Sequence, residues 1–206
     1  MQKVLRNNFI IWNVFVRKVS AGNVSARSVS GKTVMSKYIL GICGLAFFWT
    51  LSISDAIAED WQHFKTMANQ TIKAVKKGHP DDVEQLIHLQ ERLMEIGITA
   101  CKNHAQANPD DAKMFQLVVN NAENMKFLSL NEIQQQWHEK RFLLGHGIAV
   151  DKLHQNSTTG SLLDAVVHPA TAYVALREYQ RTGDIRLLEQ VDDELSEAVF
   201  QLSYLQ

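Results

Sequence analysis

Apolar residues recur every three to four positions along most of the chain after Trp61, and no stretch alternates apolar and polar residues as a β-strand does. This spacing predicts helices over about 60–77, 81–107 and 109–128, then a shorter one over about 129–142. Two more helices are expected, over about 161–182 and after Gly183-Asp184. Because the linkers are short, the sequence predicts an all-α, up-and-down helical bundle of five to six helices.

Helix-start and helix-stop residues support these boundaries. Gly78-His79-Pro80 has a glycine that ends a helix and a proline that prevents its continuation. Asn108-Pro109 places a capping side chain before a proline at the first helical position. Ser129 and Glu132 have the spacing of a capping box, in which each residue bonds the backbone amide of the other.

Pro169 lies inside the helix expected over 161–182, where a proline removes one backbone hydrogen bond and predicts a kink. The residue before a proline is biased away from α geometry, so His168 is expected to leave the helical conformation. One interpretation is a structural kink that lets the helix wrap its neighbours. The other is a binding site where the kink faces the irregular segment 146–160. The candidate ligand-binding residues are Trp137, His138, His146, His154, His168 and Tyr173.

The last helix has the most regular pattern of the chain. Leu188, Leu195 and Leu202 repeat every seven residues, and a second apolar series runs beside them. Such a narrow stripe packs against a neighbouring helix. It predicts a place in the bundle core, with a homodimer through the same residues as the alternative.

The N-terminal region has a different pattern. Met35-Ser36-Lys37-Tyr38 is a short cationic start, residues 39–51 are mostly apolar, and Ala56-Ile57-Ala58 has the small residues that signal peptidase requires. An uncleaved membrane anchor is the alternative, but a span needs about 20 apolar residues. We therefore interpret 35–58 as a signal peptide and 59–206 as a single exported domain, periplasmic or secreted, with no membrane span after cleavage.

Residues 1–34 are basic and contain no acidic side chain. An organellar presequence would have this charge, but the apolar stretch 9–16 would not form the amphipathic helix that such presequences use. We favour a start codon assigned too far upstream, with Met35 the first residue.

Charge is divided unevenly along the chain. Seven of the 21 Lys and Arg residues and one of the 22 Asp and Glu residues precede residue 59, so residues 59–206 carry 14 basic and 21 acidic side chains, a net charge of −7. Proteins that bind nucleic acid present a basic face. The balance excludes that class and favours a small molecule or an envelope protein as partner.

All eight histidines lie after residue 58, which raises the possibility of a metal or haem site. No Cys-x-x-Cys-His motif exists, so a c-type haem is excluded, while a b-type haem would need only a histidine facing a methionine or another histidine. Cys101 and His104, three apart on one helix, are the alternative metal ligands, although a closed zinc site takes four. Cys101 otherwise reads as a small buried apolar residue.

The only candidate pair of nucleophile and base is Cys101 with His104, which has no orienting third group, and the sequence contains no phosphate-binding glycine loop. The sequence therefore favours a binding or interaction protein over an enzyme. Its ligand is not identified, and no cofactor is expected under this interpretation. The alternative is a carrier of a transition metal or haem b that uses His, Met and Cys side chains in the bundle.

The signal-peptide interpretation predicts the mass of the exported protein. Intact mass spectrometry of protein from the export compartment should give a chain that begins at Glu59. A folded product that still carries Met1 would contradict the interpretation.

Overall fold

The computed structural model describes residues 60–153 and 157–205, and every regular element within them is helical. A first helix over 60–75 is followed by α2 (Val83–Ala107), α3 (Pro109–Met125), α4 (Leu130–Ile133), the π-helix η1 (Gln134–His138), α5 (Arg141–Gly145), the 3₁₀ turn η2 (Val150–Lys152), α6 (Thr158–Thr182), α7 (Arg186–Gln201) and the 3₁₀ turn η3 (Leu202–Leu205). The predicted all-α bundle is confirmed. The predicted leader and signal peptide lie outside the described residues.

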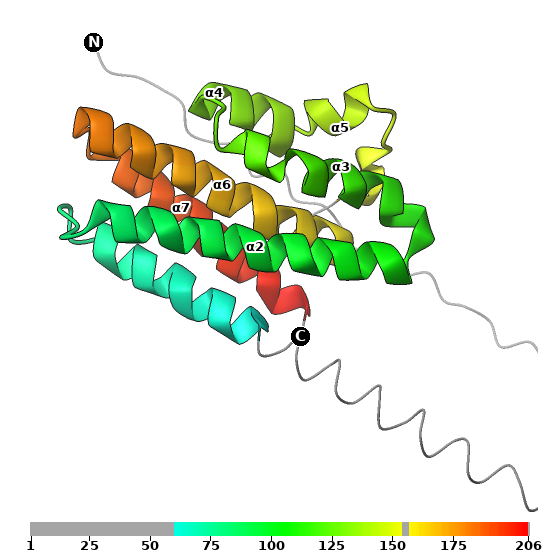
Figure 1. The fold of residues 1–206 in the computed structure, drawn as a ribbon, viewed down its shortest axis with the longest axis horizontal. Coiled ribbons are helices and arrows are strands. Elements are labelled where there is room, and N and C mark those ends of the chain that lie inside the picture. Colours follow the sequence, from blue (N-terminus) through cyan, green and yellow to red (C-terminus); the bar gives the residue numbers. More distant parts are fainter. Residues whose placement is uncertain (1–59, 154–156, 206) are drawn as a thin grey trace, which may run out of the picture.

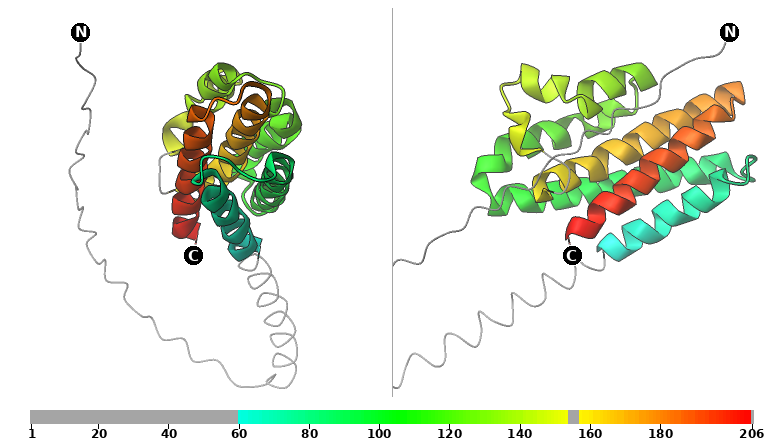
Figure 2. Two further views of the ribbon diagram at one scale, coloured as in Figure 1. Left: turned by 90° about the vertical axis from the view of Figure 1, so that its left-hand side faces the viewer. Right: turned by 180° about the vertical axis from the view of Figure 1, so that it is seen from behind.

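The long helices run side by side. Helix α6 contacts both α2 and α7, and Figure 1 shows the helix over 60–75 along the side of α2 away from α6. The end-on view in Figure 2 shows these helices grouped around a common core, with α3 to α5 on one side. No helix in the described ranges combines the length and apolar character that a bilayer crossing requires.

Residues at the helix starts form local contacts with the backbone. Asp82 caps α2, and its carboxylate accepts a hydrogen bond from the Gln85 amide at 2.9 Å. Pro109 begins α3. The capping box is also formed, because the Ser129 hydroxyl accepts from the Glu132 amide and Glu132 accepts from the Ser129 amide.

The helix expected over 129–142 is instead divided into three pieces. After one turn of α4 the hydrogen bonds change to the π pattern, with the Glu139 amide donating to the Gln134 carbonyl at 2.9 Å. Lys140 then adopts a left-handed conformation, with φ 59°. The π turn lets Ile133, Trp137 and His138 all turn toward the bundle, which regular α spacing would not allow.

Helix α6 is the centre of the bundle. It contacts α2, α3, α4 and α7, and fifteen of its residues are buried. A helix that is apolar on all sides is expected to be enclosed by others. The helix runs unbroken from Thr158 to Thr182, so the expectation that His168 leaves helical geometry was wrong. Burial of His168 and Pro169 on all sides holds the backbone in the helix despite the local bias.

Gly97 of α2 lies directly against the backbone of α6. A Cβ atom at this position would lie 2.5 Å from the carbonyl oxygen of Ala165. Ala165 is four residues before Pro169, which lacks the N–H that its carbonyl would otherwise accept in the helix. The position where α6 loses a helix hydrogen bond is therefore also one where α2 packs closely against it.

Helix α7 packs its apolar stripe against α6. Leu188, Leu195 and Leu202 are all buried within the single chain. A homodimer through these residues would require them to leave the core.

The close approach at Gly97 predicts the effect of adding one methyl group. Gly97→Ala should lower the free energy of unfolding by roughly 2 kcal/mol, since the clash with backbone outweighs the better helix propensity of alanine. Urea denaturation followed by circular dichroism measures it. The control is Gly145→Ala in α5, where an added Cβ meets no atom within 4 Å and stability should be retained.

Candidate metal centre

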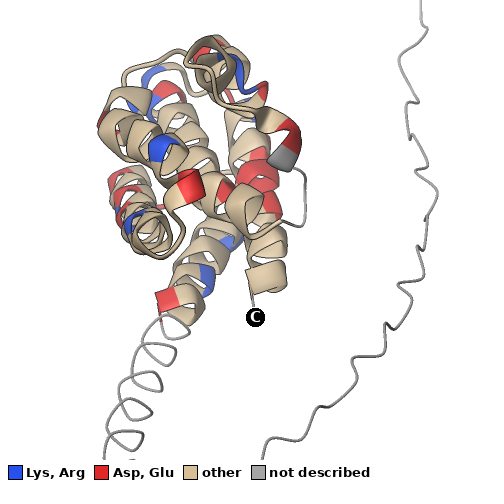
Figure 3. Ribbon diagram, turned by 90° about the vertical axis from the view of Figure 1, so that its right-hand side faces the viewer, with Lys and Arg blue, Asp and Glu red and all other residues tan. Residues whose placement is uncertain are grey.

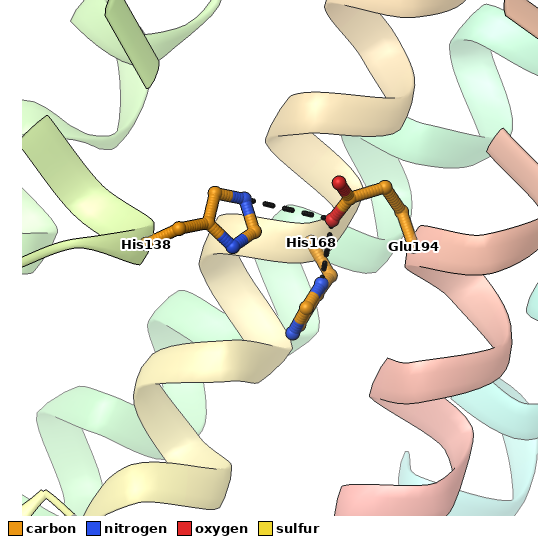
Figure 4. Close-up of side chains that lie close together, drawn as sticks. All are labelled: His138, His168 and Glu194. Carbon is orange, nitrogen blue, oxygen red and sulfur yellow. Dashed lines mark hydrogen bonds and ion pairs between the residues drawn. The ribbon is translucent and has the colours of Figure 1, made fainter. Parts of the chain in front are cut away.

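Three side chains from three separate elements converge beside α6. His138 comes from η1, His168 from α6 and Glu194 from α7. Figure 4 shows the two imidazoles directed at the same oxygen of the Glu194 carboxylate. One ligand atom from each residue lies within 4.8 Å of the other two. Among the residues that the structure describes, this is the one group of three or more His, Cys, Asp or Glu that could hold a metal ion.

One carboxylate oxygen joins the two imidazoles. His168 Nδ1 is 2.6 Å from Glu194 Oε2, and His138 Nε2 is 3.5 Å from the same oxygen. The imidazole rings are in edge-to-face contact, with centroids 5.0 Å apart. The centre is therefore compact and organised around Glu194.

Thr171 fixes the orientation of His138. Its hydroxyl donates to the Val167 carbonyl at 2.9 Å, so it is free to accept from His138 Nε2, also at 2.9 Å. Because the hydroxyl proton is already used, this contact places a proton on Nε2 in the metal-free protein. The contact holds the ring toward Glu194.

The two histidines have pKa values shifted in opposite directions. Burial lowers the pKa of His168, but its hydrogen bond to Glu194 and the nearby carboxylates outweigh this effect and raise the pKa above the usual value. Burial lowers the pKa of His138, and the charge of His168 lowers it further, against the opposing effect of Glu194 and Glu197. In the metal-free centre His168 is therefore protonated more readily than His138.

More carboxylates surround the centre than cations. Asp164 on α6 and Glu197 on α7 both act electrostatically on His168, with Lys140 close to Asp164. Burial raises the pKa of Asp164 by more than the charges of His168 and Lys140 lower it. Figure 3 shows acidic residues gathered on the turns of α7 that lead to the C-terminus. Such an excess of negative charge favours a bound cation.

The geometry suits a small divalent ion. Ligand atoms about 2.0–2.1 Å from a tetrahedral zinc ion lie about 3.3 Å from one another. The His138–Glu194 separation of 3.5 Å is close to this, whereas the His168–Glu194 separation of 2.6 Å must widen once the shared proton leaves. Two imidazoles and one carboxylate leave a fourth position open, as in catalytic zinc sites.

The other predicted ligand-binding residues lie apart from the centre. Trp137 is buried and stacks on Phe142, while His146 is exposed, and its Nδ1 donates to the Phe142 carbonyl. Tyr173 has the ammonium of Lys126 5.6 Å from its ring centroid. His154 lies outside the described residues. Of the six predicted residues, the structure brings His138 and His168 together.

Cys101 and His104 have separate partners. The Cys101 thiol donates to the Leu162 carbonyl at 3.4 Å, and burial raises its pKa to about 12. His104 bonds the carboxylate of Asp111 at 3.0 Å. These contacts link α2 to α6 and to α3. Cys101 is therefore a thiol of the core, and His104 is hydrogen-bonded to Asp111 where α2 meets α3.

Glu194 was missed by the sequence interpretation, although a signal exists. It lies three residues after Val191 and four before Ala198, at the edge of the apolar stripe of α7. A carboxylate at such a position needs a buried partner. The partners could not be named from the sequence, because they come from α6 and from a π turn.

Neither a family model, nor a curated protein, nor a solved structure matches this chain. The geometry of the three side chains is therefore the basis for inferring a function.

The raised pKa of His168 predicts how the stability of the metal-free protein depends on pH. In chelator-treated protein, Glu194→Gln should lower the free energy of unfolding by roughly 2 kcal/mol near pH 6, because a buried charged hydrogen bond is lost. The stabilisation from His168 is fully present below its unfolded pKa of about 6.5 and is lost as pH rises through the raised folded pKa. Urea denaturation of both proteins between about pH 5.5 and 9 should show the difference shrinking with pH. A pH-independent difference would contradict the assignment.

Proposed function

We propose that the protein is an exported helical bundle that binds one divalent transition-metal ion through His138, His168 and Glu194. The supporting observation is the convergence of two imidazoles and a carboxylate, from three elements, on a space in which their ligand atoms lie within 4.8 Å. Export is supported by the signal-peptide pattern over 35–58.

The backbone around His138 supports a functional interpretation. π turns are rare and occur frequently at functional sites. Here the π turn carries His138 and is followed by the left-handed Lys140. Backbone in a sparsely populated conformation has a free-energy cost, and such positions cluster at ligand sites. Here these unfavourable conformations occur where the backbone places the His138 imidazole beside Glu194.

The ligand types select among metals. Imidazole nitrogen and carboxylate oxygen suit zinc and ferrous iron, whereas cuprous copper prefers thiolate and thioether sulfur. Two imidazoles and one carboxylate with an open position also form the ligand set of non-haem iron centres. Zinc or ferrous iron is therefore the proposed class of ion. His168 must lose its proton to bind it, so affinity should increase with pH.

The geometry favours a metal ion over haem b. The His138 and His168 rings touch edge to face, which leaves no space for a porphyrin between them. A haem ligand pair of histidine and methionine would use one of the four methionines after residue 58. All four are buried among the apolar side chains of the core: Met67, Met94, Met114 and Met125.

Metal binding by the exported protein tests the proposal. Chelator-stripped protein should bind one equivalent of zinc in isothermal titration calorimetry, and zinc at 100 times its Kd should add about 2.7 kcal/mol to the free energy of unfolding. His138→Ala combined with His168→Ala should abolish binding, since two of the three ligands are removed. Circular dichroism then shows whether the variant remains helical.

The matched control is His146→Ala, which removes an exposed imidazole outside the centre and should leave zinc binding unchanged. Equal zinc binding by the wild type and the double variant would overturn the proposal. Soret absorbance in protein from its own compartment would favour the haem alternative instead.

A further inference from the structure

Asp164 is a half-buried carboxyl residue on a helix that is otherwise apolar over most of its length. It is the first Asp, Glu, Lys or Arg in α6, and the next is Arg177. Its neighbours Leu162, Leu163, Ala165 and Val166 are all buried. Among the described residues its carboxylate has no hydrogen bond and no ion pair within contact distance. Since charged groups in such places are normally paired, the position requires an explanation.

Asp164 lies one helical turn before His168, on the same face of α6. Side chains on a helix lean toward its N-terminus, so the His168 imidazole leans back over the turn that carries Asp164. Of the charged neighbours, Asp164 acts most strongly on His168 through its charge alone. The two residues are therefore electrostatic partners without a bond between them in the metal-free protein.

The orientation of the His168 ring leaves one nitrogen for Asp164. Nδ1 is directed at Glu194. Figure 4 shows the other ring nitrogen, Nε2, pointing away from both Glu194 and His138. When Nδ1 binds a metal, the proton of the neutral ring resides on Nε2 and needs an acceptor.

We infer that Asp164 is the positioning residue of the metal centre, its carboxylate accepting the Nε2–H of His168 while Nδ1 binds the ion. This inference rests on the proposed function. Histidines that bind metals almost always donate their second N–H to such a partner, which fixes the tautomer and makes the ligand nitrogen more basic. Asp164 does not bind the ion itself.

This role predicts that replacing Asp164 has different effects on metal affinity and on the stability of the metal-free protein. The Asp164 carboxylate costs free energy in the metal-free fold, because the effect of its burial exceeds the attraction of His168 and Lys140. Replacing it by a neutral side chain should leave the stability of the metal-free protein unchanged or raise it. The same replacement should weaken metal binding. Replacing a residue that serves only packing would instead lower both the stability of the metal-free protein and its affinity for metal.

The experiment compares Asp164→Asn with Glu197→Gln in the full exported protein. Zinc titration should give a Kd 10–100-fold weaker for Asp164→Asn, the usual effect of removing such a partner. Asp164→Leu, which has no acceptor, should be at least as weak. Glu197→Gln removes an equal charge that also acts on His168, from an exposed position on α7, and should stay close to the wild type.

Two further measurements separate positioning from structure. Urea denaturation of the chelator-treated proteins should show no loss of stability for Asp164→Asn. Proton NMR of the zinc-bound wild type should show a protected Nε2–H of His168 that Asp164→Leu lacks.

Each contrary result is decisive. A Kd for Asp164→Asn equal to that of the wild type, an equal loss with Glu197→Gln, or a loss of metal-free stability together with affinity would overturn the inference and leave the proposed function intact. A wild type that binds no zinc would overturn the proposed function, and the inference with it.

Discussion

The contact between α2 and α6 at Gly97 joins the two longest helices of the described part of the chain. Because Gly97 has no side chain, the two backbones meet at the carbonyl of Ala165, where Pro169 has removed a helix hydrogen bond. The helix continues without a break through the proline beside this contact. His168 is thereby placed one turn beyond the contact, on a helix that cannot rotate without breaking the core.

Beside this apolar helix the chain has a small group of ionisable residues. One oxygen of the Glu194 carboxylate lies close to both His138 and His168, whose pKa values are shifted in opposite directions. Ion pairs of this kind contribute little net stability, because desolvation offsets most of their attraction. Leucines of similar volume would pack α6 against α7 at lower cost. The stability that these residues add therefore does not account for the arrangement.

The sequence predicts the helices and their ends because those signals are local. Pro109 and Ser129 act within four residues of where they stand, and both were correctly interpreted. His138 and His168 were recognised as unusual, one beside an irregular segment and one beside a proline. Their meeting with Glu194 was not predictable, because it depends on how three elements far apart in the chain are superposed. The π turn has no counterpart in the periodicity of the sequence.

That π turn makes the centre sensitive to the hydrogen-bond pattern of one helical turn. In the π pattern each amide bonds the carbonyl five residues back, so His138 returns to the side of the helix that carries Ile133. A regular α-helix over the same residues would turn the imidazole about 140° away from the direction of Ile133, because each residue advances the helix by about 100°. The contacts of α6 with α2 and α7 would not change. The position of the His138 imidazole thus depends on a hydrogen-bond register that the rest of the bundle does not need.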